Sequence, residues 1–283
     1  MDKVVYLKSN EVKIFKIIFD ILKDILQYAT IEFYKNSKGC GFKVQDISTE
    51  KTLMFILKIN AAKLPEFYCT NDSYKIGVNL SSMCSLLKSA DDADEFIMCV
   101  NSDETQVLKL ITCNLIKRRE TEYSLKLSDL QYNQTVFPNL CDFDVHVIIN
   151  TEDFHKMCKD MKKIGSELDI RCTNNTIVFS CKGQITERST TYNIDNVNSQ
   201  GVQINYITEN KNVIIHGVYE LAHLIQFSKC SSFCPKLQIL MKIKKFPICL
   251  RYSVGELGYL TALITTVSVN HTETSDNANE INY

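Results

Sequence analysis

The spacing of hydrophobic and polar positions along the chain alternates between the period of a helix and the period of a strand. Over residues 11–29 apolar side chains recur every three or four positions and lysines and aspartates fill the opposite face, which predicts an amphipathic helix. Residues 41–45 and 53–59 alternate with a period of two and predict strands. A second helix is predicted over 77–88, where an Asn or Ser can cap the first amides. Further strands are predicted over 95–101, 107–116 and 121–127.

The same order starts again after Pro138. Residues 142–150 predict a strand, and residues 154–164 repeat the apolar stripe and lysine-bearing face of the first helix. Residues 217–229 repeat the second helix, including its initial Gly-Val. The repetition predicts a duplicated α+β fold, in which each half is an antiparallel sheet with two helices. The remaining strands are predicted over 168–172, 176–182, 189–193, 236–243, 248–253 and 260–267.

The repeat also sets the domain boundaries. We predict an N-terminal domain over 1–127, a connector over 128–138 and a C-terminal domain over 139–267. The connector is polar at first and then apolar, as expected of a segment that lies along a surface groove. The polar tail, 268–283, is expected to be disordered.

Composition narrows the class of protein. With 45% hydrophobic and 23% charged residues, 9 glycines and 4 prolines, the chain is neither disordered nor fibrous. The formal net charge of −1 gives no sign of a nucleic-acid partner. The 12 cysteines lack any CxxC pair and predict reduced, mostly buried thiols rather than disulfides or a zinc site. The sequence has no run of 18 apolar residues, so no membrane span or membrane partner is expected.

Enzymatic motifs are absent from the sequence. It contains no P-loop, GxSxG, HExxH or GxGxxG motif, and its 5 histidines lack the spacing of a metal site. Acidic pairs such as Asp91-Asp92 lie in a polar loop and are interpreted as solvated surface. We therefore expect neither catalysis nor a cofactor or metal.

Several strings resemble the proliferating cell nuclear antigen (PCNA) family of eukaryotic-type DNA sliding clamps. GVNLSSM, which begins at Gly77, is the most specific of them. Three features depart from the family: Glu50-Lys51 at the front-side groove, the C-terminal LITT (263–266), which lacks the usual aromatic residue and Ala-Pro, and the longer tail. The other matching strings are ILKDI (21–25), YSLKLSDL (123–130), residues 154–165, VFSCKG (178–183) and GYL (258–260), so the resemblance spans roughly 12–267 in one order.

The resemblance implies a homotrimeric ring that encircles double-stranded DNA, with lysine-bearing helices facing the channel. Such a ring is a polymerase processivity factor and a docking platform for replication and repair proteins. Lysine suits a protein that must slide, because its flexible point charge can exchange between phosphates without reading bases. The competing interpretation is a solvated helix face. The residues implied to bind DNA are Lys13, Lys16, Lys23, Lys88, Lys156, Lys159, Lys162, Lys163 and Lys229.

The resemblance also implies a groove for client peptides and a set of subunit contacts. A peptide with adjacent aromatic residues needs an apolar pocket beside a strand-like connector, although ordinary packing of the connector would give the same pattern. Edge strands over 119–127 of one subunit and 178–185 of the next are expected to pair and close the ring. The implied groove residues are Ile47, Val136, Phe137, Pro138, Phe246, Pro247, Leu263 and Ile264. The implied interface residues are Tyr123, Leu125, Val178, Ser180 and Lys182.

Two other functions remain open from the sequence. The chain could be one subunit of a heterotrimeric checkpoint-type or transcription-associated clamp, which would not trimerise alone. It could also be a monomeric processivity protein that binds DNA on an open basic face. The expected partners of a clamp are a DNA polymerase, other clients and a clamp loader. The expected location is the nucleus for a cellular protein and the nuclear or cytoplasmic replication site for a viral one.

Overall fold

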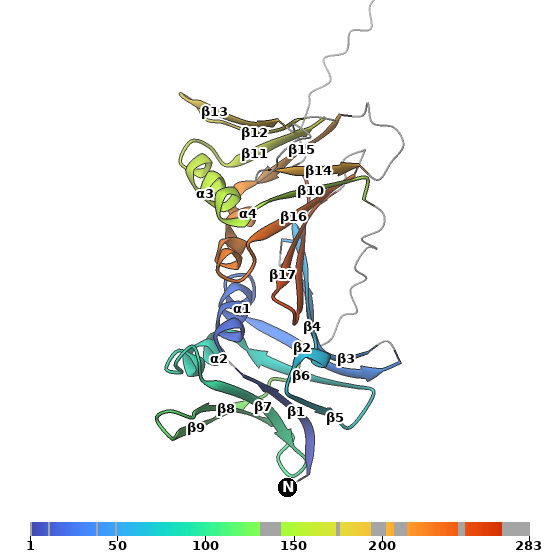
Figure 1. Cartoon of the computed structure of the whole chain (residues 1–283), viewed down its shortest axis with the longest axis vertical. Helices are drawn as coiled ribbons and strands as arrows, with labels where there is room; N and C mark the ends of the chain where they lie inside the picture. The colour runs from blue at the N-terminus through green and yellow to red at the C-terminus, as the bar shows by residue number, and fades with distance from the viewer. Residues whose placement is uncertain are drawn as a thin grey trace, which may run out of the picture.

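The chain is an α+β protein built from antiparallel sheets with helices on one side (Figure 1). The computed structural model describes residues 2–10, 12–37, 39–48, 50–130, 143–173, 176–193, 202–206, 214–242 and 247–267. The helices of this part are α1 (Lys13–Lys23), α2 (Leu80–Leu87), α3 (Thr151–Lys162) and α4 (Leu221–Gln226), with the 3₁₀ helices η1 (Ala61–Lys63) and η3 (Phe227–Ser232).

Three sheets hold the described strands. A five-stranded sheet has the order β5 (Glu66–Cys69), β1 (Lys3–Ser9), β7 (Glu95–Asn101), β8 (Val107–Asn114), β9 (Arg119–Lys126). A four-stranded sheet has the order β13 (Glu187–Asn193), β12 (Thr176–Lys182), β11 (Glu167–Cys172), β15 (Ile215–Glu220). The central nine-stranded sheet runs β14 (Gln203–Tyr206), β10 (Val145–Asn150), β16 (Lys236–Met241), β17 (Ile248–Val254), β18 (Gly258–Ile264), β4 (Leu53–Asn60), β3 (Gly39–Ile47), β2 (Tyr28–Asn36), β6 (Ser73–Asn79).

The central sheet joins the two halves of the chain. Strand β18 of the second half pairs with β4 of the first half, with Leu260 opposite Leu57. Both side chains are buried in one continuous hydrophobic core. Burial of apolar area on this scale supplies most of the favourable free energy of folding, so the two halves are held as one unit.

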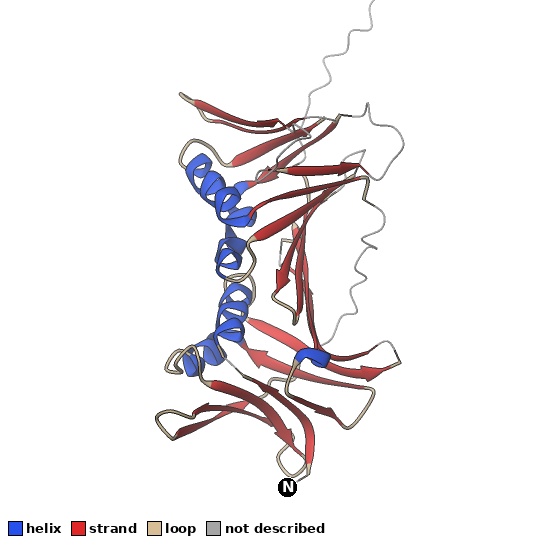
Figure 2. Cartoon of the chain, in the orientation of Figure 1, coloured by secondary structure: helices blue, strands red, loops and turns tan. Residues whose placement is uncertain are grey.

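The helices cover one face of the sheets because each buries an apolar stripe (Figure 2). In α1 the ring of Phe15 contacts the rings of Phe42 on β3 and Phe96 on β7, with centroids 6.3 Å and 5.0 Å away. In α3 Phe154 packs edge-on against Phe179 of β12. Such buried aromatic contacts fix each helix to its sheet, and they leave the polar side of every helix on the same side of the molecule.

The start of the second helix in each half differs from the sequence prediction. Residues 77–79 and 217–220 are strand, and the helices begin only at Leu80 and Leu221. Gly77 serves a close approach rather than a helix start, because a Cβ there would lie 2.2 Å from the Ser128 carbonyl oxygen. The amide of Ser128 donates to the Gly77 carbonyl oxygen at 2.9 Å, so this glycine lets the start of the connector dock on β6.

The predicted connector and tail lie mostly outside the described residues. Only 128–130 of the connector 128–138 is described, and none of the tail 268–283. The domain boundaries at 127 and 139 therefore stay predictions.

Candidate nucleic-acid interface and partner surfaces

The outward surfaces of α1–α4 and η3 form a single helix face, which carries all nine lysines implied to bind DNA. The polar composition of this face follows from the helical period. The apolar stripe of each helix is buried in the core, and the remaining positions, which face outward, are polar. At the start of α3 the Asn150 side chain accepts a hydrogen bond from the Asp153 backbone amide at 3.0 Å, and Glu152 and Asp153 occupy the first turn. Acidic residues at this end and Lys159 and Lys162 in the last turn both complement the helix dipole.

Five lysines of the helix face are exposed and form no ion pair within 4.0 Å with any described residue. Three of them lie on α3, whereas α1 and the end of α2 contribute one each. A lysine without a carboxylate partner keeps its full charge for an incoming phosphate. These five are Lys13, Lys88, Lys156, Lys159 and Lys162.

The other lysines of the face are already paired. Lys16 lies 2.9 Å from an Asp92 carboxylate oxygen and donates to the Ala90 carbonyl oxygen. Lys163 lies 2.9 Å from Asp160. Lys23 lies 2.6 Å from Asp20 on the preceding turn of α1. The free charge of the helix face is therefore concentrated on α3.

Lys229 of η3 forms the only ion pairs on the described helix face that join the two halves of the chain. Its ammonium lies 2.6 Å from both Asp20 and Asp24 of α1. Burial alone would lower the pKa of Lys229, but the hydrogen bonds that its ammonium donates to the two carboxylates outweigh this effect, so this pKa lies above its usual value. Burial would likewise raise the pKa of Asp20, but hydrogen bonds from Lys229 and Lys23 bring it below its usual value.

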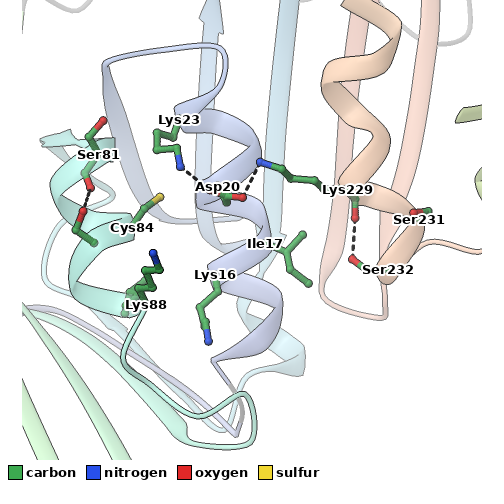
Figure 3. Close-up of a pocket in the computed structure, with 12 residues that line it drawn as sticks. Lys16, Ile17, Asp20, Lys23, Ser81, Cys84, Lys88, Lys229, Ser231 and Ser232 are labelled. Atoms are coloured by element: carbon green, nitrogen blue, oxygen red, sulfur yellow. Dashed lines mark hydrogen bonds and ion pairs between the residues drawn. The ribbon is translucent and has the colours of Figure 1, made fainter. Parts of the chain in front are cut away.

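A hollow of about 680 Å³ lies at this junction, between α1, α2 and η3 (Figure 3). Three of its basic side chains come from α1 and α2, and the Lys229 side chain reaches across from η3 to Asp20. Burial raises the pKa of the Cys84 thiol at its wall to about 11, so that thiol stays protonated at neutral pH. The hollow is lined by Lys16, Ile17, Asp20, Lys23, Ser81, Cys84, Ser85, Leu87, Lys88, Lys229, Ser231 and Ser232. Hydroxyl and ammonium donors in this mixture suit phosphate oxygens.

The interdomain bridge predicts a pH-dependent stability. Replacing Lys229 by methionine should lower the free energy of unfolding near neutral pH by up to about 1 kcal/mol, a limit set by solvent screening of half-exposed ion pairs. Because the folded-state pKa of Asp20 is depressed below 3.8, its contribution is present above that value and is lost as the pH falls through the folded pKa. Urea denaturation near neutral pH and at about pH 2.5 should show the difference shrinking in acid. A constant difference would contradict it.

The implied client groove divides between the two faces of the central sheet. Leu263 lies on the face turned away from the helices, in a small apolar cluster with Met54, Leu240 and Cys249. Ile264 points to the opposite face and is fully buried in the main core, so the prediction that it lines the groove is wrong. Alternation of side chains along a strand requires this separation.

The remaining groove residues are only partly described. Ile47 is half-buried and lies opposite Met54 in the β3–β4 ladder, which places it on the same face as Leu263. Pro247 is half-buried just before β17. Val136, Phe137, Pro138 and Phe246 lie outside the described residues. We define the outer apolar patch as Ile47, Met54, Phe143, Leu240, Cys249 and Leu263.

One of the two predicted sheet edges is wrong. Strand β12, which carries Val178, Ser180 and Lys182, pairs on one side with β11 and on the other with β13. Its backbone groups are used within the chain, so the strand that ends the described four-stranded sheet on this side is β13. The other predicted edge strand, β9, is the last strand of the five-stranded sheet, and its pairing with a second subunit stays a prediction. Its Tyr123 and Leu125 side chains, however, pack against the chain's own core.

The described residues show no arrangement that suggests catalysis. Among them, no group of three or more His, Cys, Asp or Glu side chains could hold a metal ion. All described cysteines are free thiols, and burial raises the pKa of Cys158 and of Cys249 to about 12. The buried His155 forms a hydrogen bond with the Tyr252 hydroxyl, and burial lowers the pKa of this histidine to about 3. No described helix is long and apolar enough to cross a membrane.

Comparisons with known proteins cover nearly the whole chain. The family model "Proliferating cell nuclear antigen, N-terminal domain" matches residues 5–136, and "Proliferating cell nuclear antigen, C-terminal domain" matches residues 138–267. The chain is 24% identical over 266 residues to the "Probable DNA polymerase sliding clamp 1" of Paramecium bursaria Chlorella virus 1, covering 93% of this chain and 96% of the relative. It is 24% identical over 257 residues to "Proliferating cell nuclear antigen" of Chaetomium thermophilum, covering 89% and 94%.

A solved structure shares the fold. The crystal structure of "Proliferating Cellular Nuclear Antigen from Entamoeba histolytica" superposes with a TM-score of 0.81 at 20% sequence identity, covering 94% of this chain and 99% of that one. The predicted duplicated fold is confirmed by this likeness and by the two family models.

Proposed function

The chain belongs to the proliferating cell nuclear antigen family, and from this premise we propose that it is a DNA sliding clamp and polymerase processivity factor. The observation that carries the proposal is the helix face, where five lysines without ion pairs to described residues lie on one side of a chain whose net charge is −1. Such a face attracts the phosphate backbone without reading sequence. The net charge near zero therefore does not argue against DNA binding, because what matters is how the charges are distributed over the surface.

Binding and sliding place opposite demands on this face. Flexible lysines pass from one phosphate to the next at little cost, whereas bidentate arginine forks would hold particular phosphates. The described helices of this face contain lysines and no arginine. Part of the lysine charge is already neutralised by Asp20, Asp24, Asp92 and Asp160. This moderate charge suits a protein that is retained on DNA by topology rather than by affinity.

Ring closure completes the proposal. We infer that three copies associate head to tail, each using its β9 edge against the β13 edge of the next copy. The two edges lie towards opposite ends of the long axis of the chain (Figure 1), which is the arrangement that a closed heterologous ring requires. Each edge also follows a hairpin tip that exposes an apolar side chain, Ile116 before β9 and Ile185 before β13, each 96% exposed.

As a clamp the protein acts through binding partners and not through chemistry of its own. Its partners are double-stranded DNA, a DNA polymerase and other clients, and we propose that a clamp loader opens the ring. The outer apolar patch is the proposed client site. Related chains include viral and fungal proteins, so the proposed location is the nucleus for a cellular protein and the replication site for a viral one.

Light scattering and DNA loading test this function. The purified chain should have three times its 32.4 kDa mass in solution, and it should stay on nicked circular DNA and leave after linearisation. A monomer that binds circular and linear DNA alike would establish the open monomeric alternative. A chain that trimerises only with other subunits would establish the heterotrimeric one.

The paired carboxylates of α1 give a further prediction. Replacing Asp20 and Asp24 by asparagine removes the partners of Lys23 and Lys229, and we expect duplex DNA binding to strengthen. The plot of log K against log salt should steepen by about 0.9 for each additional phosphate that the protein neutralises. The matched control is Glu256→Gln, which frees Lys63 away from the helix face and should leave the slope unchanged. An unchanged slope in the double variant would count against the helix face as the DNA surface.

A further inference from the structure

A second cationic site lies on the opposite side of the molecule from the helix face. It is a hollow of about 230 Å³ on the outer face of strands β16–β18, lined by Lys236, Gln238, Arg251, Ser253, Gly258 and Tyr259. We call it the outer basic hollow. Along β17 the residues Leu250, Tyr252 and Val254 enter the core. Since side chains alternate along a strand, Arg251 and Ser253 face away from the helices.

The cations of the outer basic hollow are not neutralised by described carboxylates. Neither Arg251 nor Lys236 has a carboxylate oxygen within 4.0 Å among the residues that the structure describes. The Arg251 guanidinium lies 4.4 Å from the centre of the Tyr259 ring. Lys58 stands opposite Tyr259 in the β18–β4 ladder, and its ammonium lies 5.6 Å from the centre of the Tyr34 ring.

Stacking prepares Arg251 to bind a planar anion. A guanidinium held against an aromatic ring keeps its edge donors free in a fixed plane, and that fork matches the geometry of a carboxylate. Burial lowers the pKa of His146, and the Arg251 charge lowers it further. The charge of Arg251 therefore reaches His146 on the neighbouring part of this sheet.

The outer basic hollow is continuous with the outer apolar patch. Cys249 of the patch and Arg251 of the hollow are two residues apart on the same face of β17, a separation of about 7 Å. An extended segment lying along β17 would therefore meet apolar contacts at one end and cations at the other.

We propose that the outer basic hollow binds carboxylate side chains of client segments whose apolar residues occupy the outer apolar patch. The clients selected in this way combine aromatic anchors with an acidic stretch a few residues away. This inference rests on the proposed function, because it assumes that the patch is the client site. The charge complementarity and the continuity of the two surfaces identify an acidic peptide as the occupant.

Peptide binding to the assembled full-length protein tests the proposal. The probes are fluorescein-labelled peptides with two adjacent aromatic residues and an Asp/Glu-rich block about four residues away, which spans about 13 Å when extended, synthesised with the block on either side. Each has a control peptide with Asn and Gln in place of the acids. At low salt at least one acidic peptide should bind about tenfold or more tightly than its control, as expected for hydrogen bonds to charged groups.

Variants locate the effect. Arg251→Ala and the more exposed Lys236→Ala should each remove most of the preference for the acidic peptide. The control is Arg171→Ala, which removes a cation on β11 that is paired with Asp169. It should leave that preference unchanged, and it controls for long-range electrostatic attraction between the protein and the peptide. Loading of Arg251→Ala on circular DNA should equal that of the parent, so failure of this inference is distinguishable from failure of the clamp function.

Three results would overturn the inference. The first is equal binding of acidic and neutral peptides by the parent protein. The second is an equal loss of preference in Arg171→Ala. The third is a charge preference that emerges only when residues 268–283 are deleted, since that would make the acidic tail, with Glu273, Asp276 and Glu280, the occupant of the hollow in place of a client.

Discussion

Replacing Lys156, Lys159 and Lys162 by alanine is expected to abolish most of the salt-dependent affinity for linear duplex DNA. These lysines are exposed, share one helix and have no carboxylate within 4.0 Å among the described residues. In a trimer the substitution removes them from all three copies of α3. The slope of log K against log salt should fall by about 0.9 for each phosphate that the variant no longer neutralises, measured by fluorescence anisotropy over a salt series.

Topology separates this effect from misfolding. The variant should form the same trimer as the parent and, once loaded, should stay on nicked circular DNA, because a closed ring leaves only by opening or over an end. Loss of affinity for linear DNA together with retention on circles is therefore the signature of a basic channel. The matched control replaces Lys3, Lys35 and Lys63, three exposed lysines outside the four helices. Equal slopes for the two triple variants would reject the assignment of α3 to the channel.

The alternation of periods was sufficient to predict the class of fold, but not where each element begins. The Gly-Val pairs at Gly77 and Gly217 were assigned to helices because apolar spacing continues through them. Gly77 lies opposite Thr30, and Gly217 lies opposite Ile170, each inside a β-ladder. Short apolar runs at a strand-to-helix junction fit both periods, and only long-range pairing with a distant strand decides between them.

Local rules could have corrected some of the site predictions. Leu263 and Ile264 are adjacent in one strand, so alternation alone shows that both cannot face the same groove. Strand β13 reads Glu-Arg-Ser-Thr-Thr-Tyr-Asn, and its half-exposed, polar pattern is typical of an edge, unlike the alternating buried pattern of β12. The polar composition of residues 187–193 was the available signal for the edge of that sheet.

Other features of the site have no local signal. The Asp20–Lys23 pair is visible from its spacing on one helix, but Lys229 and Asp24 are 205 positions apart. The charge that Lys229 offers to DNA therefore depends on how the two halves pack. The outer basic hollow depends in the same way on the ladders that bring β16, β17 and β18 together.

Breaking the β13 edge is expected to convert the ring into monomers. In a sheet, successive residues of a strand turn their N–H groups to opposite sides. One of the neighbouring residues Thr190 and Thr191 therefore directs its N–H away from β12 and towards the next subunit. Proline at that position removes the donor and places its ring against the approaching strand. Thr190→Pro and Thr191→Pro are made separately, and at least one should have a mass near 32.4 kDa by light scattering.

The corrected edge makes this test discriminating. The exposed faces of β9 and β13 hold alternate residues, and an antiparallel register with full overlap brings Lys126 of one copy opposite Glu187 of the next. A Glu187→Lys substitution should therefore weaken the trimer and Lys126→Glu should restore it, because like charges opposite each other destabilise a strand pair. Ser180→Lys, which adds a cation on the internal strand β12 opposite Ser189 and Asp169, is the control and should leave the trimer intact. A trimer that is lost in Ser180→Lys but kept in both proline variants would return the interface to β12.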